Sequence, residues 1–199
     1  MNSKPRSNST SEPGRQAPAW LARLLGIIDR LGMAGGVLAA LALASLTVLI
    51  LLEIAFRLAS NLNADLPAGM PNAWEYSAYL MGVAFMGGAA LTLRAGAHIR
   101  VSVLIGNVPA AAQRVLECFA CAIGLLMSGF LAWSLILFTW ASYVRGQTSI
   151  SSDTPIWIPE AAVTLGAILL ALQMLARLLQ SLWGLPLELP HLKATGASE

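Results

Sequence analysis

The sequence is short of charge. Only 11% of its 199 residues are charged, whereas about 25% is usual for a globular domain, and 57% are hydrophobic. A soluble domain with so few charges could not cover its surface with polar groups, so the composition indicates a membrane protein. The 12 basic and 10 acidic residues nearly balance. This balance excludes the basic stripe of a nucleic-acid-binding protein, and we expect no nucleic acid as a partner.

Cysteine and histidine are also scarce. Cys118 and Cys121 are too few for a disulfide framework, and no second pair accompanies them as a metal site would need, so we interpret them as small packing residues. His98 and His191 fall outside the long apolar runs, so neither is placed to ligate a haem inside a membrane span. Phosphate-binding loops and nucleophile motifs are absent too. The sequence therefore predicts no catalytic residue, no metal site and no cofactor, and we do not expect an enzyme.

Long uncharged runs, in contrast, are present. About 20 apolar residues are needed to cross the hydrocarbon core as a helix. We predict an all-α membrane protein whose four transmembrane helices span about residues 31–55, 75–94, 115–144 and 157–180, within a domain of residues 31–185. Residues 1–18 are predicted to form a disordered tail and residues 186–199 a second tail. The first run is long enough to span and lacks a cleavage site, so we expect a retained anchor rather than a signal peptide.

The basic residues are sorted by their side of the membrane. Ten of the twelve lie in the N-terminal segment, in the loop between the second and third spans, or in the C-terminal segment, which share one side. Only Arg57 and Arg145 lie on the other side. Cytoplasmic segments carry the excess of Lys and Arg. We therefore predict that both termini and both tails are cytoplasmic, and that the loops near residues 53–75 and 145–156 face outward.

Two segments are predicted to lie in the membrane interface. Residues 19–30 place their apolar side chains largely on one side, with Arg23, Asp29 and Arg30 elsewhere, which is typical of an amphipathic helix on the inner leaflet. A plain N-terminal extension of the first span is the alternative. A second, short surface helix is expected over residues 97–108. Five tryptophans mark span ends, as an aromatic belt predicts: Trp74, Trp140 and Trp157 at outer ends, Trp20 and Trp183 at inner ends.

The interiors of the spans hold almost no ionisable groups. Intramembrane charges usually mark ion pathways or proton relays, so the sequence offers no ion site of its own. Small residues instead recur at every fourth position, which favours close helix packing in lipid, either within the chain or with another protein. We therefore interpret the chain as a partner subunit rather than an autonomous pump. The candidate packing residues are Gly32, Gly36, Ala120, Gly124 and Ser128.

Two stretches resemble a known family. The first is WEYSAYL at residues 74–80, followed by GG at 87–88 and by RAGAHIRV at 94–101. The second is TPIWIP at residues 154–159, followed by Gly166 and by an apolar helix that ends in Gln173 and Arg177. With four spans and inward termini, these stretches resemble the small membrane subunit, the DctQ type, of tripartite ATP-independent periplasmic (TRAP) transporters, over roughly residues 25–185.

The resemblance implies a transporter of three components in the bacterial inner membrane. A large membrane subunit carries the substrate and sodium sites and moves as an elevator, and a periplasmic binding protein delivers an organic acid. The small subunit enlarges the static scaffold, and a sodium gradient rather than ATP drives uptake. The expected partners are therefore the large subunit, the periplasmic substrate-binding protein and membrane lipids.

The resemblance also suggests roles for single residues. Glu75 either neutralises a basic group on the large subunit or caps its own helix. Arg100 binds a lipid phosphate or a partner carboxylate, or only anchors the inner side. Asp65, Arg145 and Asp153 are either docking residues for the periplasmic protein or solvated loop charges. The candidate interface or anchoring residues are Trp74, Glu75, Tyr79, Gly88, His98, Arg100, Pro155, Trp157, Pro159 and Gly166, of which the two prolines are expected to shape the entry to the fourth span.

Two other functions stay open. A self-sufficient exporter built from homo-oligomerising four-helix units would place an essential carboxylate within the first span, whereas Glu53 comes after it. A cofactor-free structural subunit of another membrane complex also fits these features. Co-purification with a much larger membrane protein would separate a transporter subunit from the exporter.

Overall fold

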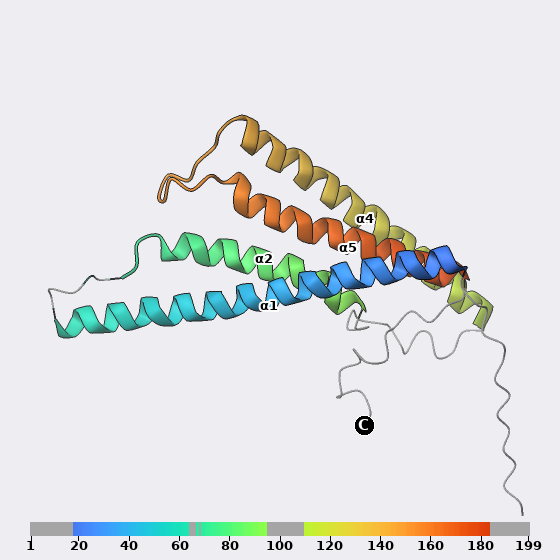
Figure 1. Ribbon diagram of the computed structural model, residues 1–199, viewed down its shortest axis with the longest axis horizontal. Coiled ribbons are helices and arrows are strands. Elements are labelled where there is room, and N and C mark those ends of the chain that lie inside the picture. The colour runs from blue at the N-terminus through green and yellow to red at the C-terminus, as the bar shows by residue number, and fades with distance from the viewer. Residues whose placement is uncertain (1–17, 64–66, 68, 95–109, 184–199) are drawn as a thin grey trace, which may run out of the picture.

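The computed structural model describes residues 18–63, 67, 69–94 and 110–183, and its regular elements over these residues are all helices. In chain order they are α1 (Ala19–Leu62), α2 (Ala73–Arg94), α4 (Ala110–Val144) and α5 (Trp157–Trp183) (Figure 1). Each is long and apolar enough to cross a membrane. The predicted all-α fold with four spans is therefore confirmed. The two predicted tails and the predicted surface helix at 97–108 lie outside the described residues, apart from Pro18.

Helix α1 is much longer than a membrane requires. Its 44 residues extend about 66 Å, against a hydrocarbon core of about 30 Å. Residues 19–30, predicted as a separate interfacial helix, are helical but continue into the span without a break, as in the alternative of an N-terminal extension. Their position at the membrane surface stays a prediction. The uncharged stretch 31–52 forms the middle of this helix, and Glu53 and Arg57 follow it.

The helices are arranged in the order α1, α2, α5, α4. Helix α1 packs on α2, α2 on α5 and α5 on α4, and α5 also contacts α1. Figure 1 shows the α1–α2 pair and the α4–α5 pair meeting near Ala19 and Trp183, and separating toward their other ends. We call the first of these the termini end, and the second, which carries residues 145–156 and the start of α2, the loop end. Because α5 contacts all three other helices, it holds the two pairs together.

Glycines set the closest approaches between the helices. Gly87 of α2 faces the carbonyl oxygen of Gly35 in α1, and Gly166 of α5 faces the backbone of Met86 and Gly87. A Cβ atom at Gly166 would lie 2.8 Å from the Met86 carbonyl carbon, which is closer than real Cβ atoms approach. These glycines therefore let the backbones of three helices meet at one level, as small residues do in membrane proteins.

The predicted packing residues differ in what they contact. Ser128 is buried, and its hydroxyl donates to a carbonyl of its own helix at 2.7 Å. Ala120 is exposed, so its contact with another protein stays a prediction. The three predicted glycines each lie against a side chain of a neighbouring helix: Gly32 against Gln173, Gly36 against Leu91 and Gly124 against Met174.

Polar side chains join α5 to the other helices at the termini end. The Gln173 amide, only 1% exposed, donates to the Ile28 carbonyl of α1 at 2.9 Å. One turn later, Arg177 donates to the Leu93 carbonyl, close to the end of α2 where carbonyls lack donors within their own helix. A buried apolar cluster lies beside these bonds: Leu21, Leu25 and Ile28 from α1 with Ala176 from α5.

One of the two cysteines takes part in a helix contact at the same end. Cys118 of α4 places its sulfur 3.0 Å from the Ser181 hydroxyl of α5, and both Cys118 and Cys121 are free thiols. This contact agrees with the interpretation of the cysteines as packing residues.

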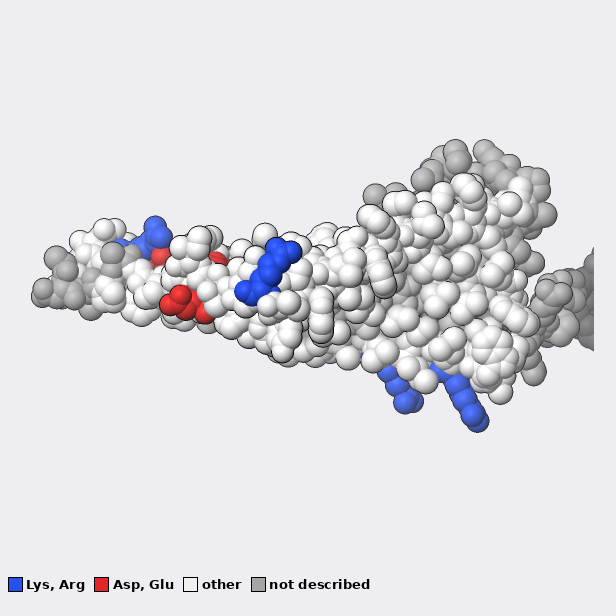
Figure 2. Space-filling view, turned by 90° about the horizontal axis from the view of Figure 1, so that it is seen from above, with Lys and Arg blue, Asp and Glu red and all other residues white. Residues whose placement is uncertain are grey.

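Most of the surface is apolar. Only 11% of the residues in the most apolar stretch of α1, and likewise of α4, are buried within the chain. The face shown in Figure 2 is white over most of its area, and only a few charged side chains appear on it. The outer faces of α1 and α4 are therefore left for lipid or for another protein to cover.

Candidate functional site

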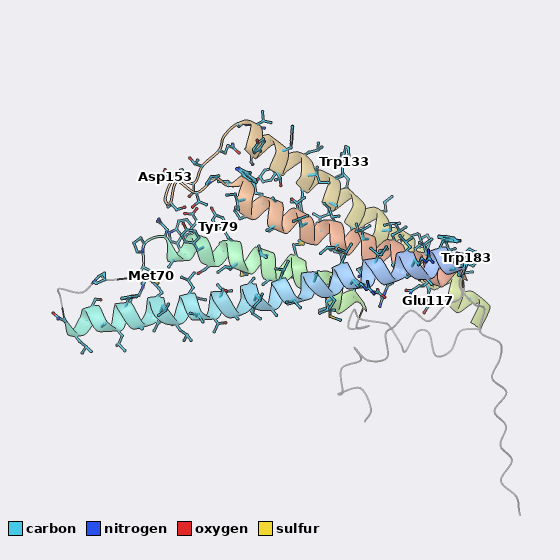
Figure 3. The ribbon with its side chains drawn as sticks, in the orientation of Figure 1. Met70, Tyr79, Glu117, Trp133, Asp153 and Trp183 are labelled. Carbon is cyan, nitrogen blue, oxygen red and sulfur yellow. The ribbon has the colours of Figure 1, made fainter. Side chains whose placement is uncertain are left out.

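A buried carboxylate joins two segments at the loop end. Glu75 lies in the first turn of α2 and is 4% exposed. Its Oε1 accepts hydrogen bonds from the Tyr79 hydroxyl, one turn along the helix, and from the Ser152 hydroxyl at 3.1 Å. Ser152 belongs to the α4–α5 connection, and Figure 3 shows that connection, labelled at Asp153, next to Tyr79. Glu75 therefore fixes the connection to α2.

Tyr76 adds a second link between the same segments. Its hydroxyl lies 3.1 Å from the Thr154 hydroxyl, which in turn lies 2.8 Å from that of Ser152. The rings of Tyr76 and Tyr79 meet edge to face with their centroids 6.2 Å apart. We call Glu75, Tyr76, Tyr79, Ser152 and Thr154 the loop clasp, because together they hold the α4–α5 connection against the start of α2.

The α4–α5 connection itself forms a tight hairpin. Gly146 and Asp153 adopt φ angles of +60° and +54°, a conformation in which the chain reverses and which suits glycine and aspartate. Ile150 at the tip is fully exposed, and Arg145 and Asp153 on either side of it are exposed as well. Two backbone hydrogen bonds close the hairpin: Ser149 N to Thr154 O at 2.9 Å and Ile156 N to Gln147 O at 3.1 Å.

The start of α5 follows the two prolines. The helix begins at Trp157, and Pro159 lies in its first turn, where a missing amide donor costs no helical bond. Pro155 pairs with Thr148 across the hairpin. The Trp157 ring meets the Tyr143 ring of α4 edge to face, with their centroids 5.5 Å apart. Both prolines thus lie where the chain enters the fourth helix, and their role in shaping that entry stays a prediction.

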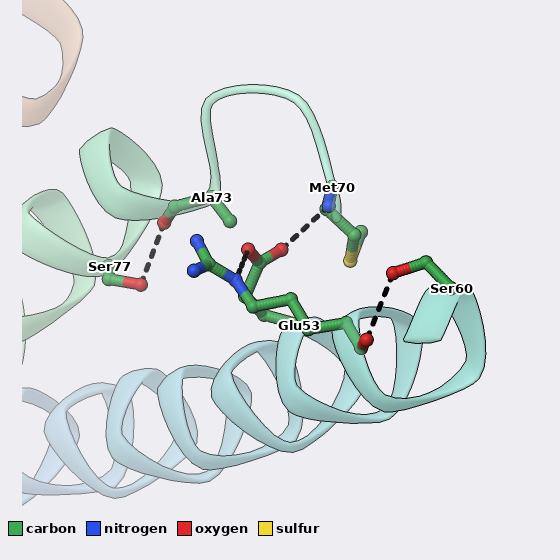
Figure 4. A network of polar contacts seen from close by, with 6 residues as sticks. Glu53, Ser60, Met70, Ala73 and Ser77 are labelled. Carbon is green, nitrogen blue, oxygen red and sulfur yellow. Dashed lines mark hydrogen bonds and ion pairs between the residues drawn. The ribbon is translucent and has the colours of Figure 1, made fainter. Parts of the chain in front are cut away.

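A second carboxylate holds the connection between α1 and α2. Glu53 accepts a hydrogen bond from Arg57 Nε at 2.7 Å and another from the Met70 amide at 2.6 Å (Figure 4). Gly69, the neighbour of Met70, has no side chain to separate the loop from the carboxylate. Both Glu53 oxygens are thus engaged in fastening a loop to α1.

An apolar cavity of about 320 Å³ lies at the loop end, between α2, α4 and α5. Tyr79, Phe138 and Val163 are among its lining residues, and Glu160 is the acidic one. Among the described residues, no group of three His, Cys, Asp or Glu side chains could hold a metal ion. At this end Glu75 Oε1 and both Glu53 oxygens accept hydrogen bonds, whereas Glu75 Oε2 and Glu160 Oε2 are buried without a partner among the described residues. The bonded carboxylates hold the two loops on the helices.

The structure brings some predicted site residues together and leaves others apart. Glu75 and Tyr79 share the loop clasp, and Gly166 is buried against α2. Trp74 is 71% exposed, and a Cβ atom at Gly88 would make only an ordinary contact with Ala39. Three predicted residues lie outside the described residues: Asp65, His98 and Arg100.

Sequence reasoning missed the hydroxyls that join the α4–α5 connection to α2. Ser152, which bonds to Glu75, and Thr154, which bonds to Tyr76, precede α5 by a few residues, and nothing in their spacing marks them as partners of side chains far away in the chain. Gly87 was visible in the motif beside Gly88, but it is Gly87 that makes the close backbone contact. Two adjacent glycines in the middle of a span are the sequence signal that could have indicated this contact.

Comparison with known proteins gives one match. The sequence model of the family described as "Tripartite ATP-independent periplasmic transporters, DctQ component" matches residues 46–184, more than two thirds of the chain. The matched region begins within α1 and includes α2, α4 and α5 with the loop clasp between them. No curated protein and no solved structure matches the chain.

Proposed function

The chain belongs to the DctQ component family of tripartite ATP-independent periplasmic transporters, and on that premise we propose that it is the scaffold subunit of a sodium-driven importer of an organic acid. Membership makes it the small subunit of a transporter in the inner membrane, and the family is not one of enzymes. In this proposal a large elevator-type subunit packs against the chain, and a periplasmic binding protein delivers the acid. Membership also favours this function over a homo-oligomeric exporter.

The observation that supports the scaffold role most is the open arrangement of the helices. A self-contained transporter encloses its substrate path, whereas α1 and α4 each leave most of their apolar surface uncovered. Two carboxylates near the loop end are engaged in fastening loops: Glu75 bonds to Ser152, and Glu53 to Arg57 and the Met70 amide. Such a chain is suited to rigid contact with a larger membrane protein.

The hairpin of residues 145–156 supports a docking role for the loop end. The loop clasp holds the hairpin on α2, so Arg145, Ile150 and Asp153 form a fixed rather than a loose surface. We place the periplasmic binding protein against this surface. The same proposal puts both termini in the cytoplasm, where the excess of basic residues contacts lipid headgroups. Trp74 and Trp157 stand beside the hairpin as anchors at the outer interface.

Reconstitution tests the proposed function directly. The chain, the large membrane subunit and the binding protein are purified and combined in liposomes, and uptake of candidate organic acids is followed with and without an inward sodium gradient. We expect uptake only when all three proteins and the gradient are present. Transport by the chain alone, or uptake by the other two proteins at the same rate without it, would contradict the proposal.

A further inference from the structure

All but one of the tryptophans of this chain lie near the end of a helix. Five of the six lie within four residues of a helix end, namely Trp20, Trp74, Trp140, Trp157 and Trp183. Trp133 lies 11 residues before Val144, the last residue of α4, which is about 17 Å along the helix. With Trp140 and Tyr143 at the outer interface and a hydrocarbon core of about 30 Å, Trp133 lies near the middle of the membrane.

Trp133 points away from its own chain. It is 62% exposed, and Figure 3 shows its side chain on the side of α4 that faces away from α5. Its indole N–H has no hydrogen-bond partner within the part of the chain that the structure describes. A hydroxyl can turn back to its own helix, as Thr47 does when it donates to the Leu43 carbonyl at 2.9 Å. The indole nitrogen lies too far from the helix backbone to do so.

Trp133 is the centre of a continuous exposed stripe along α4. We define the α4 stripe as Phe119, Leu126, Phe130, Trp133, Leu137 and Trp140, whose spacings of 7, 4, 3, 4 and 3 residues keep them on one face. Gly124 and Ser128, which lie on the α5 side, are on the opposite face. Gly129 flanks Trp133 one turn earlier, and a Cβ atom there would contact nothing within 4 Å. The stripe therefore has large aromatic side chains beside the open space at Gly129. A surface of this shape can pack closely against a second helix.

From these observations we infer that the α4 stripe is the surface that binds the large membrane subunit, and that the Trp133 indole donates a hydrogen bond to an acceptor on a helix of that subunit. This inference rests on the proposed function and names the surface that carries it. The acceptor is a Ser or Thr hydroxyl, an Asn or Gln amide oxygen, or a backbone carbonyl, because these groups occur at mid-membrane depth in packed helices.

The same observations argue against lipid, and against a second copy of this chain, as the occupant of this face. Acyl chains at mid-membrane depth offer no acceptor, so lipid leaves the indole N–H unpaired. A symmetric dimer through the α4 stripe would place each Trp133 against its copy at the same depth, where no side chain of the stripe is an acceptor. A different protein that supplies the acceptor satisfies the group.

The test uses co-expression of this chain, carrying one tag, with the large subunit carrying another. Trp133→Phe removes the N–H and keeps an aromatic ring. Trp20→Phe is the matched control, because it changes the same residue type at an exposed position outside the α4 stripe, near a helix end where water and headgroups supply acceptors. We expect Trp133→Phe to lower the recovery of the large subunit about three- to tenfold, the ratio that follows from losing one intramembrane hydrogen bond. Trp20→Phe is expected to leave recovery unchanged.

Photo-crosslinking makes the test independent of how well a variant folds. A photoreactive amino acid at position 133 is expected to crosslink the large subunit, and the same group at Phe85, which is 71% exposed on α2, is expected not to. Crosslinks from 133 to a second copy of this chain, or to neither protein while the wild-type complex is recovered, would overturn the inference and leave the proposed function standing. Failure of the wild-type chain to recover any large subunit would overturn both.

Discussion

At the residue scale, Gly166 sets how closely α5 approaches α2. A methyl group there would lie 2.8 Å from the Met86 carbonyl carbon and 3.0 Å from the Gly87 amide nitrogen, and a backbone cannot move aside as a flexible side chain can. We expect Gly166→Ala to lower the free energy of unfolding by about 1–3 kcal/mol, the usual cost of overpacking. Thermal unfolding of the purified chain in detergent measures this loss.

Gly129→Ala is the matched control for that substitution. It makes the same change in α4 at a position where nothing lies within 4 Å, and alanine favours a helix more than glycine does. Its unfolding midpoint is expected to stay the same or to rise slightly. Equal losses at Gly129 and Gly166 would show that the effect comes from removing a glycine as such and not from the contact with α2.

Glu75 offers a second prediction at this scale. Glu75→Ala leaves the Tyr79 and Ser152 hydroxyls without their acceptor, which costs about 1–3 kcal/mol for buried groups. Glu75→Gln keeps an acceptor oxygen and is expected to lose less. Hydrogen exchange of the hairpin amides checks the cause, because exchange at Ser149 and Ile156 speeds up only if the hairpin loosens.

The same experiment separates the two roles considered for Glu75. If the carboxylate serves only within the chain, loss of stability and loss of the complex with the large subunit go together in both variants. A Glu75→Gln chain that keeps a slowly exchanging hairpin yet fails to bind the large subunit would show that the charge itself acts on the partner.

At the scale of elements, one contact between α1 and α5 pairs a glycine with a side-chain amide. Gly32 leaves the space that the Gln173 side chain fills on its way to the Ile28 carbonyl, and a Cβ atom at Gly32 would lie 2.3 Å from Gln173 Nε2. The two residues therefore depend on each other. We expect Gly32→Ala to destabilise the chain when Gln173 is present and to do little in a Gln173→Ala background.

A double-mutant cycle measures that dependence. The four proteins are unfolded by heat in the same detergent, and a coupling free energy of about 0.5–3 kcal/mol is expected between residues in contact. Gly36→Ala with Gln173→Ala is the control cycle, because Gly36 faces Leu91 instead. Additive effects of Gly32→Ala and Gln173→Ala would contradict the arrangement.

The hairpin of residues 145–156 carries a prediction about docking. Ile150 is fully exposed at the tip and contributes nothing to the loop clasp, so Ile150→Asp is expected to leave the stability of the chain unchanged. Uptake in the reconstituted system is expected to fall, because the change puts a charge into a surface that the binding protein covers. Ser151→Asp, at an exposed neighbour, is the control for charge alone. Unchanged uptake with Ile150→Asp would place the binding protein elsewhere.

The limits of the apolar runs could be predicted from the sequence, but the extent of the helices could not. Arg94 and Arg145 close two of the runs, because a span end needs a residue that reaches water, whereas α4 begins at Ala110, five residues before the predicted span. In α1 the charges at Arg23, Asp29 and Arg30 are predicted to mark where lipid ends, and nothing there interrupts the backbone. Charge thus predicts the limits of a span better than the limits of a helix.

At the scale of the whole molecule, the number of helices could be predicted and their order in space could not. Hydrophobic periodicity identifies the buried face of a helix in water because the other face is polar. In this chain the faces toward lipid, toward a neighbouring helix and toward a partner are all apolar, so the sequence does not distinguish them. Phe85 and Leu93 of α2 are both large apolar residues, yet Phe85 is 71% exposed and Leu93 only 1%. The glycines carry more information, and even there Gly87 and Gly88 could not be told apart.

The orientation of the molecule in the membrane gives the last prediction. The termini end and the loop end must lie on opposite sides, and the excess of basic residues near the termini end predicts that the hairpin is periplasmic. In a background with Cys118→Ala and Cys121→Ala, Ile150→Cys places a thiol at the exposed hairpin tip. A membrane-impermeant maleimide added to intact cells with a permeable outer membrane is expected to label it.

Leu182→Cys, at an exposed position near the end of α5, is the matched partner of that variant, and we expect it to be labelled only after the inner membrane is opened. The reverse pattern would place the termini outside. It would then also remove the hairpin from the side on which a periplasmic binding protein can reach it, while the α4 stripe, which depends on depth and not on direction, would still be available to the large subunit. Labelling at positions 150 and 182 therefore determines the orientation of the chain without assuming that the α4 stripe binds the large subunit.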